Sequence, residues 1–179
     1  MLSVTTADQT KLYVKDWGNG TPVILIHGWP LSADSWDDQA LAIAEEGYRV
    51  LAYDRRGFGR SSQPWDGYDY DILSDDLAAV IEQTDAQGAI VVGFSMGGGE
   101  VARYMSRHGG KSLVKAALVS SVLPFRLKTD DNPTGTEQSA FDETAAAIRA
   151  DRAQFLTGFF DKFFGVNNHP DAVLSLIHI

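Results

Sequence analysis

The sequence contains no cysteine among its 179 residues. Disulfide bonds, thiol catalysis and zinc–thiolate sites are therefore excluded for this chain. It also has no apolar run long enough to cross a bilayer. Residues 1–8 lack the basic start and apolar core of a signal peptide. These absences together predict a soluble, cytoplasmic protein.

Basic residues are few relative to acidic ones. The chain has 15 Lys and Arg against 24 Asp and Glu, which gives a net charge of −9. Such a charge disfavours nucleic-acid backbones and anionic membrane surfaces, so we expect neither as a partner. Hydrophobic residues make up 44% of the chain, an ordinary share for a globular protein. The length favours one domain with a buried core.

Strand-like and helix-like patterns alternate along the chain. Apolar and polar residues alternate over 2–6 and 11–17, which predicts an antiparallel hairpin at a sheet edge. The continuous apolar run 22–26 predicts a central strand buried on both faces. The alternation predicts an α/β fold with a mostly parallel sheet flanked by helices. Further strands are expected at 48–53, 89–92 and 113–122, and helices at about 32–46, 70–84, 100–108, 141–150 and 152–164.

The organising motif lies at residues 93–97, which read Gly-Phe-Ser-Met-Gly between an apolar strand and a helical segment. This order of strand, sharp turn and helix is typical of a nucleophile elbow, with Ser95 at its tip. Glycine at 93 and 97 omits Cβ atoms that would clash where strand and helix approach. The Met96 backbone N–H would help to stabilise an oxyanion. The alternative interpretation is an ordinary glycine-rich turn.

Two other segments follow predicted strands. Residues 27–30 read His-Gly-Trp-Pro, at the place where an oxyanion loop belongs in such a sheet. The Trp29 backbone N–H would then join that of Met96 in a two-donor hole, and we interpret the His27 side chain as structural. Residues 54–57, Asp-Arg-Arg-Gly, are interpreted as a charged, hydrogen-bonded surface turn.

A serine nucleophile needs a base and an orienting acid, which follow it along the chain in these sheets. His108 lies at the end of the helix after the elbow and should point away from Ser95. His169 lies in a polar loop, and His178 is the second-last residue. None follows a strand that would deliver it to the serine. We therefore expect that the triad Asp and His are not present in this chain.

The pattern changes after Pro124, where a polar loop leads into two helical segments. The second carries five phenylalanines in ten residues. These side chains either pack on the core or form a cap whose aromatics line a substrate pocket. The phenylalanines are Phe155, Phe159, Phe160, Phe163 and Phe164.

Dinucleotide binding is a rival function for a chain of alternating strands and helices. It fails because no Gly-x-Gly-x-x-Gly follows the first strand.

Residues 27–36, 54–65 and 93–104 together resemble the α/β-hydrolase fold, and more narrowly the cofactor-free (non-heme) haloperoxidases, aryl esterases and perhydrolases. The resemblance covers roughly residues 1–170. It implies a serine esterase that forms an acyl-enzyme from a small-molecule ester or short carboxylic acid. Water or hydrogen peroxide then attacks the acyl group, and the peracid oxidises halide. No cofactor and no metal are implied. The implied site comprises the nucleophile Ser95, the oxyanion hole of Trp29 and Met96, and a substrate pocket at Trp29, Pro30, Phe159 and Phe160.

The family continues well beyond the length of this chain, with its last strands and the triad Asp and His there. We therefore expect residues 1–123 to be the N-terminal part of the hydrolase core. Residues 124–173 would begin a helical cap, and 174–179 would be a non-native or truncated tail. We expect an inactive fragment with an exposed sheet edge, and a homo-oligomer for the full-length parent. The alternative is a non-catalytic binding module, or a half-enzyme completed by a partner chain.

Overall fold

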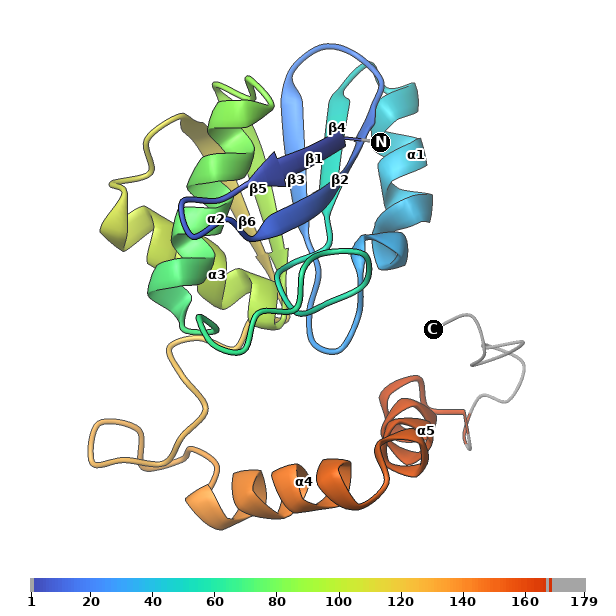
Figure 1. Cartoon of the computed structure of the whole chain (residues 1–179), viewed down its shortest axis with the longest axis vertical. Helices are drawn as coiled ribbons and strands as arrows, with labels where there is room; N and C mark the ends of the chain where they lie inside the picture. The colour runs from blue at the N-terminus through green and yellow to red at the C-terminus, as the bar shows by residue number, and fades with distance from the viewer. Residues whose placement is uncertain (1, 167, 169–179) are drawn as a thin grey trace. The chain divides into compact units, whose positions relative to one another are not determined.

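The computed structural model describes residues 2–166 and 168. The chain divides into two compact units, Met1–Pro124 and Phe125–Ile179, and each is described by itself (Figure 1). The interpretation of the two units as a hydrolase core and a cap stays a prediction.

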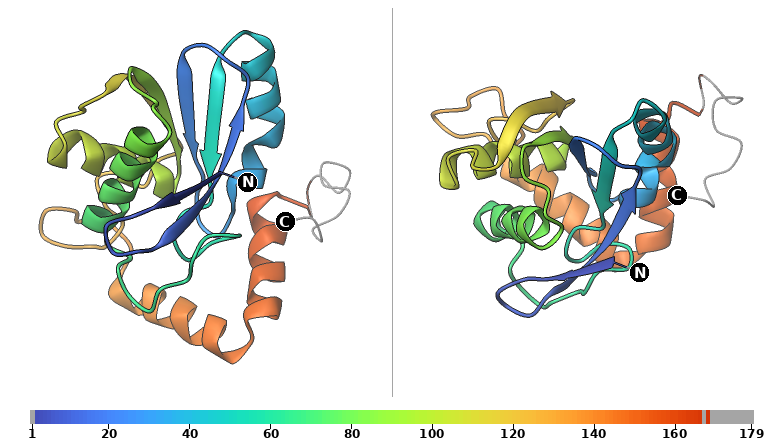
Figure 2. Two further views of the ribbon diagram at one scale, coloured as in Figure 1. Left: turned by 45° about the horizontal axis from the view of Figure 1, so that its top comes forward. Right: turned by 90° about the horizontal axis from the view of Figure 1, so that it is seen from above.

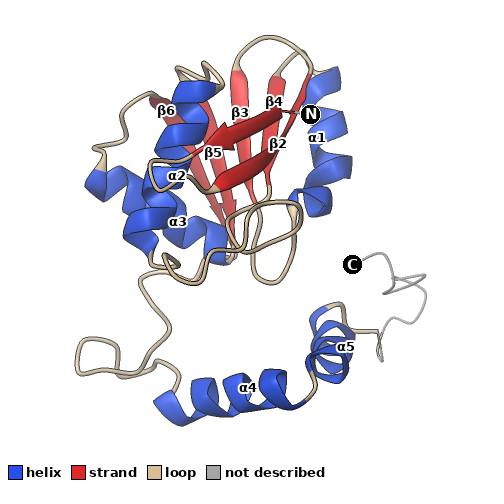
Figure 3. Ribbon diagram, viewed as in Figure 1, coloured by secondary structure: helices blue, strands red, loops and turns tan. Residues whose placement is uncertain are grey.

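A six-stranded sheet forms the centre of the first unit (Figure 3). Its strand order is β1-β2-β4-β3-β5-β6, and β1 and β2 pair antiparallel as the predicted edge hairpin. β4, β3, β5 and β6 are parallel to one another. The expected mostly parallel sheet is therefore confirmed. The strands are β1 Leu2–Thr5, β2 Lys11–Trp17, β3 Pro22–Ile26, β4 Arg49–Tyr53, β5 Ala89–Phe94 and β6 Leu113–Val119.

Helices cover both faces of this sheet (Figure 2). Ile24 and Ile26 of β3 belong to one buried cluster with side chains of α2 (Tyr70–Gln83) and α3 (Met96–Arg107). Val23 and Leu25 belong to a second cluster with Ala40 of α1 (Asp37–Glu45). Successive side chains of a strand point to opposite faces, so a strand covered on both sides must be apolar throughout. This explains the continuous apolar run of β3.

Several boundaries differ from the sequence-based expectation; for example, the helix expected at 141–150 begins at Gln138. The helix expected from residue 32 begins as a short 3-10 turn, η1 Ala33–Trp36, capped by Ser32. The expected strand 113–122 ends at Val119, because Ser120 has a φ of 43°. The helix expected from Glu100 begins at Met96. Three successive glycines disfavour a helix by propensity, but tertiary packing overrides this preference.

The parallel strands end at a common edge of the sheet, where the chemistry-bearing segments gather. His27 follows β3, Asp54 follows β4, Ser95 follows β5 and Ser120 follows β6. In open α/β sheets this carboxyl edge is where ligands bind. The fold therefore brings together segments that are far apart in sequence.

Strand β6 lies at the end of the strand order opposite β1 and forms an exposed edge of the sheet. Val114 is 63% exposed and Leu118 is 48% exposed, and within the described residues only β5 pairs with this strand. Unpaired backbone groups beside exposed apolar side chains form a template for strand pairing between chains. This agrees with the exposed edge expected from the sequence.

We expect the chain to self-associate through β6, and Val114→Lys to reduce this, because a charge on an edge strand opposes pairing. Sedimentation velocity over a concentration series measures the effect. Leu41→Lys is the matched control. Leu41 is 58% exposed on α1, and α1 packs against β4, which β3 and β5 separate from β6 in the sheet. Equal association of the two variants would contradict the prediction.

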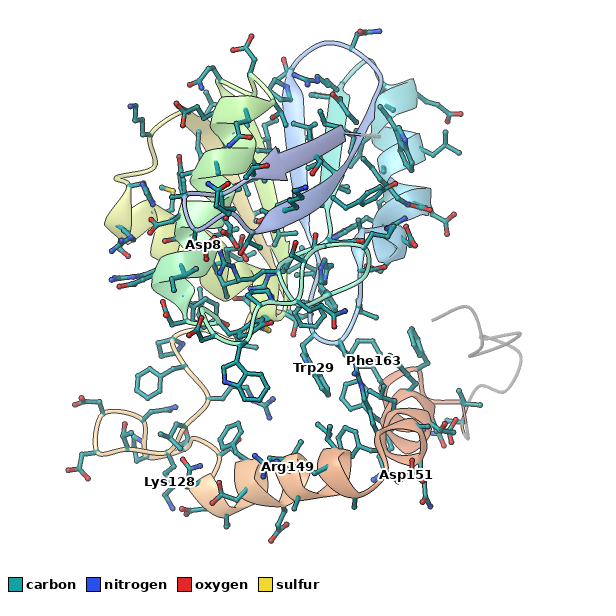
Figure 4. All side chains as sticks on the ribbon, viewed as in Figure 1. Asp8, Trp29, Lys128, Arg149, Asp151 and Phe163 are labelled. Carbon is teal, nitrogen blue, oxygen red and sulfur yellow. The ribbon has the colours of Figure 1, made fainter. Side chains whose placement is uncertain are left out.

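The second unit contains α4 Gln138–Ala150 and α5 Arg152–Phe163. The Asp151 side chain, labelled in Figure 4, accepts a hydrogen bond from the Gln154 N–H at 2.9 Å and so caps α5. Phe155, Phe159 and Phe163 stack along one face of α5, with ring centroids 6.3 and 5.6 Å apart. The substrate pocket expected at Phe159 and Phe160 stays a prediction. No helix within the described residues is long and apolar enough to cross a membrane.

Candidate active site

Ser95 sits at the junction of β5 and α3 with φ 51° and ψ −114°. A serine at positive φ is strained and persists only where its surroundings impose the conformation. Here the Ser95 N–H donates to the Val119 carbonyl at 2.9 Å, and the Val122 N–H donates to the Ser95 carbonyl at 3.3 Å. The end of β6 and the residues just after it therefore hold the turn in place.

The two glycines of the motif allow three backbone segments to meet beside the serine. A Cβ at Gly93 would lie 2.5 Å from the Gly97 carbonyl oxygen. A Cβ at Gly97 would lie 2.5 Å from the Ile26 carbonyl oxygen of β3. Real Cβ atoms do not approach backbone oxygens so closely. The expected role of both glycines thus has a direct geometric basis.

The loop after β3 runs directly past the serine. A Cβ at Gly28 would lie 3.0 Å from the Ser95 Cβ. Trp29, labelled in Figure 4, is the next residue of this loop. Met96 is the first residue of α3, and N–H groups in the first turn of a helix have no intrahelical acceptor. The two candidate oxyanion donors therefore belong to neighbouring segments beside Ser95, and their role stays a prediction.

His27 is fully buried and uses both of its ring nitrogens. Nδ1 is 2.8 Å from the Gly28 carbonyl oxygen, and Nε2 accepts the Arg55 N–H at 3.0 Å. A carbonyl oxygen can only accept, so Nδ1 carries the proton and the ring is neutral. Burial lowers the pKa of His27 to about 4. The ring holds the loop, and neither nitrogen is available as a base for Ser95.

The buried His27 should make the stability of the protein depend on pH. Between its ordinary pKa of 6.5 and the native value of about 4, only the unfolded chain takes up a proton. The free energy of unfolding should therefore fall by roughly 3 kcal/mol as the pH drops through this window. Urea unfolding from pH 4 to 7 measures this slope. His27→Gln removes the group, and a variant with the same slope as wild type would contradict the prediction.

Residues 54–56 correct the sequence-based interpretation as a surface turn. Asp54, Arg55 and Arg56 are exposed by only 0%, 1% and 1%. Asp54 accepts hydrogen bonds from the Ala33 N–H at 2.8 Å and the Arg60 N–H at 2.7 Å. The Arg60 guanidinium also donates to it, and these bonds lower the pKa of Asp54 against the effect of burial. The expected hydrogen bonds exist, but they lie inside the protein.

Each buried arginine forms an ion pair with a carboxylate, and neither pair was predicted from the sequence. Arg56 donates from Nε and Nη2 to Asp76 of α2, both at 2.6 Å, and from Nη1 to Asp8 at 2.8 Å. Arg55 donates from Nε to Glu100 of α3 at 2.7 Å. Burial raises the pKa of Asp76 and of Glu100. One sequence signal could have identified the Arg56 pair: Asp76 is an acidic residue within the apolar stripe of α2.

His108 lies at the C-terminal end of α3, as the sequence indicated. Its Nε2 is 2.8 Å from Asp75 Oδ1, and its ring stacks on Tyr104 with centroids 4.8 Å apart. A helix of this length places it about 18 Å from Ser95. His169 and His178 lie outside the described residues. Within the part of the chain that the structure describes, no histidine is therefore placed to activate Ser95.

Comparison with known proteins places this fold in a family. The alpha/beta hydrolase fold family matches residues 21–172. A non-heme chloroperoxidase of Streptomyces lividans is 52% identical over 176 residues, covering 97% of this chain and 64% of that protein. A bifunctional esterase/perhydrolase of Acinetobacter calcoaceticus is 49% identical over 175 residues, covering 96% and 63%.

A solved structure shows the same arrangement. The bromoperoxidase of Bacillus anthracis superimposes with a TM-score of 0.89 at 43% identity, over 96% of this chain and 63% of that chain. The chain thus spans a little under two thirds of the length of these relatives. Since the family match covers most of the sequence and the sheet has the expected topology, this chain belongs to the α/β-hydrolase fold family.

Proposed function

We propose that Ser95 is the nucleophile of a serine hydrolase that cleaves carboxylic or aryl esters through an acyl-enzyme. The observation that carries the proposal is the strained backbone of Ser95, φ 51°, at the tip of the β5–α3 turn. Strain of this kind clusters at active sites, where it aims a side chain at a ligand. The activities named for the relatives, non-heme chloroperoxidase and esterase/perhydrolase, support the same chemistry.

The reaction follows from the groups beside the serine. The Ser95 Oγ bonds to the ester carbonyl carbon, and the carbonyl oxygen takes up negative charge. The Trp29 and Met96 N–H groups donate to this oxyanion, and losing one such donor costs about 3 kcal/mol of transition-state stabilisation. The C–O bond to the alcohol then breaks, and the alcohol leaves with the serine proton. Water releases the carboxylic acid from the acyl-enzyme, whereas hydrogen peroxide releases a peracid.

We propose that this chain is a poor catalyst by itself. Among the described residues, His27 has both ring nitrogens engaged and His108 is remote from the serine. An enzyme without its triad base loses on the order of 10⁶ in kcat and keeps the residual effect of binding and the oxyanion hole. The placement of His27 and His108 also fits a second candidate, which is a non-catalytic binding module or a half-enzyme completed by a partner chain.

A fluorophosphonate probe and phenyl acetate test this proposal. We expect a slow covalent adduct on Ser95, seen by peptide mass spectrometry, and ester turnover far below that of the full-length relatives. Ser95→Ala should abolish the adduct, whereas Ser106→Ala, on the exposed side of the same helix, should keep it. A probe adduct that persists in Ser95→Ala would exclude Ser95 as the nucleophile. Ser95-dependent turnover at the rate of the relatives would exclude the fragment interpretation.

A further inference from the structure

We propose that Arg55 is a positioning residue that ties together the two halves of the oxyanion hole. This inference rests on the proposed function, because the hole matters only if Ser95 attacks a carbonyl. One half is the Trp29 N–H in the loop after β3, and the other is the Met96 N–H at the start of α3. Arg55 follows β4 and is hydrogen-bonded to residues of both segments. Its backbone N–H donates to His27, and its side chain donates to Glu100 of α3.

The first connection runs through His27 to the Gly28–Trp29 peptide. The Gly28 carbonyl accepts from His27 Nδ1–H at 2.8 Å and from the Leu31 N–H at 3.0 Å. A peptide unit is planar, so fixing this carbonyl also fixes the direction of the Trp29 N–H, which belongs to the same unit. The His27 ring is itself held at Nε2 by the Arg55 backbone N–H at 3.0 Å.

The second connection runs through Glu100 to α3. Arg55 Nε donates to Glu100 Oε2 at 2.7 Å, and the Tyr53 hydroxyl of β4 donates to the other oxygen of Glu100. Glu100 lies four residues after Met96, about one helical turn along α3. Holding Glu100 therefore fixes the position of the first turn, where the Met96 N–H lies. Arg55 thus sets the separation of the two donors.

The hydrogen bonding of Arg55 is poor for a residue that serves stability alone. Its side chain is 1% exposed, yet Nη1 and Nη2 have no partner among the described residues. A buried donor without a partner costs about 1–3 kcal/mol. The neighbouring Arg56 is equally buried but uses all three of its nitrogens on Asp76 and Asp8. A buried pair retained at such a cost is consistent with a role in geometry.

The double variant Arg55→Met/Glu100→Gln tests the inference. It removes both buried charges together, and the glutamine oxygen can still accept from the Tyr53 hydroxyl. The matched control Arg56→Met/Asp76→Asn removes an equally buried pair whose hydrogen bonds among the described residues go to each other and to Asp8, not to His27 or α3. Backbone amide shifts of Trp29 and Met96 in ¹H–¹⁵N spectra report the geometry without any chemistry. The rate of fluorophosphonate addition to Ser95 reports the consequence.

We expect the test variant to shift both amides and to slow adduct formation at least tenfold, since small misplacements cost about that much or more. The control should leave both amides and the rate near wild type. Unchanged Trp29 and Met96 amides in the test variant, or equal changes in the control, would overturn the inference. If the double variant does not fold, Arg55→Lys takes its place and Arg56→Lys becomes the control, because both keep the buried positive charge. A Trp29 amide shift in Arg55→Lys that is absent from Arg56→Lys then supports the connection, and its absence overturns it.

The two proposals can fail separately. A probe adduct that persists in Ser95→Ala would refute the proposed function, while the amide shifts would still report whether Arg55 couples the loop to the helix. Conversely, normal labelling with unchanged amides in the test variant would refute only the role of Arg55.

Discussion

Gly97→Ala is expected to destabilise the first unit by about 2 kcal/mol, although alanine is the better helix former. The new Cβ would lie 2.5 Å from the Ile26 carbonyl oxygen and 3.0 Å from that of His27. Both neighbours are backbone atoms of the central strand and its loop, which cannot swing aside. Overpacking of this kind costs about 3 kcal/mol, and the helix propensity of alanine returns about 1 kcal/mol.

The loss should lower the melting temperature by about 4–8 °C for a chain of this size. Tryptophan fluorescence measures it well, because all four tryptophans lie in the first unit. The variant should also lose the Ser95 adduct, because α3 must move away from β3. Gly158→Ala on α5 is the control, since a Cβ there meets nothing within 4 Å. We expect the control to be neutral or slightly stabilising in circular dichroism. A Gly97→Ala protein as stable as wild type would contradict the close approach of α3 to β3 at this position.

Asp76→Ala should destabilise the protein by about 3–5 kcal/mol, because it leaves the buried charge of Arg56 without its buried partner. The Asp76 carboxylate receives two hydrogen bonds from Arg56, each at 2.6 Å. Arg56 is 1% exposed, so its charge has no access to water. Its remaining partner, Asp8, lies in the turn between β1 and β2 (Figure 4) and is half exposed. The midpoint of urea unfolding measures the loss.

Asp16→Ala is the matched control for this prediction. Asp16 also receives two hydrogen bonds from one guanidinium, that of Arg49, at 2.9 and 2.7 Å. The two pairs have similar geometry, but Asp16 and Arg49 are 28% and 25% exposed. An exposed pair contributes about 1 kcal/mol or less. Equal losses in the two variants would show that burial does not govern the cost.

The elements around the candidate site were predictable because their signals are local. The apolar run of β3, the strand before Ser95 and the stripe of α2 each depend on neighbours within a few residues. The glycines at 93 and 97 identify the sharp turn for the same reason. The early start of α3 was missed, because local propensity disfavours a helix with three glycines, whereas close packing against Ile26 of β3, Ser121 and Tyr70 requires them.

The contacts of residues 54–56 could not be read from the sequence in the same way. Arg55 and Glu100 are 45 residues apart along the chain, and Arg56 and Asp8 are 48 apart. An Asp-Arg-Arg-Gly segment after a strand has the composition of an exposed turn. It is buried only because carboxylates from α2, α3 and the first hairpin converge on it. Charged residues are almost never fully buried unless they are paired in this way.

By itself, the sequence determined the strand–turn–helix around Ser95, the mostly parallel sheet and the structural role of His27, because short-range patterns encode them. Only the tertiary structure decided which charges are buried, where α3 begins, and that Arg55 stands between the His27 loop and the serine helix. These features depend on the meeting of four strand ends at one edge of the sheet. That meeting is a property of the folded chain, since no segment carries information about its distant partners.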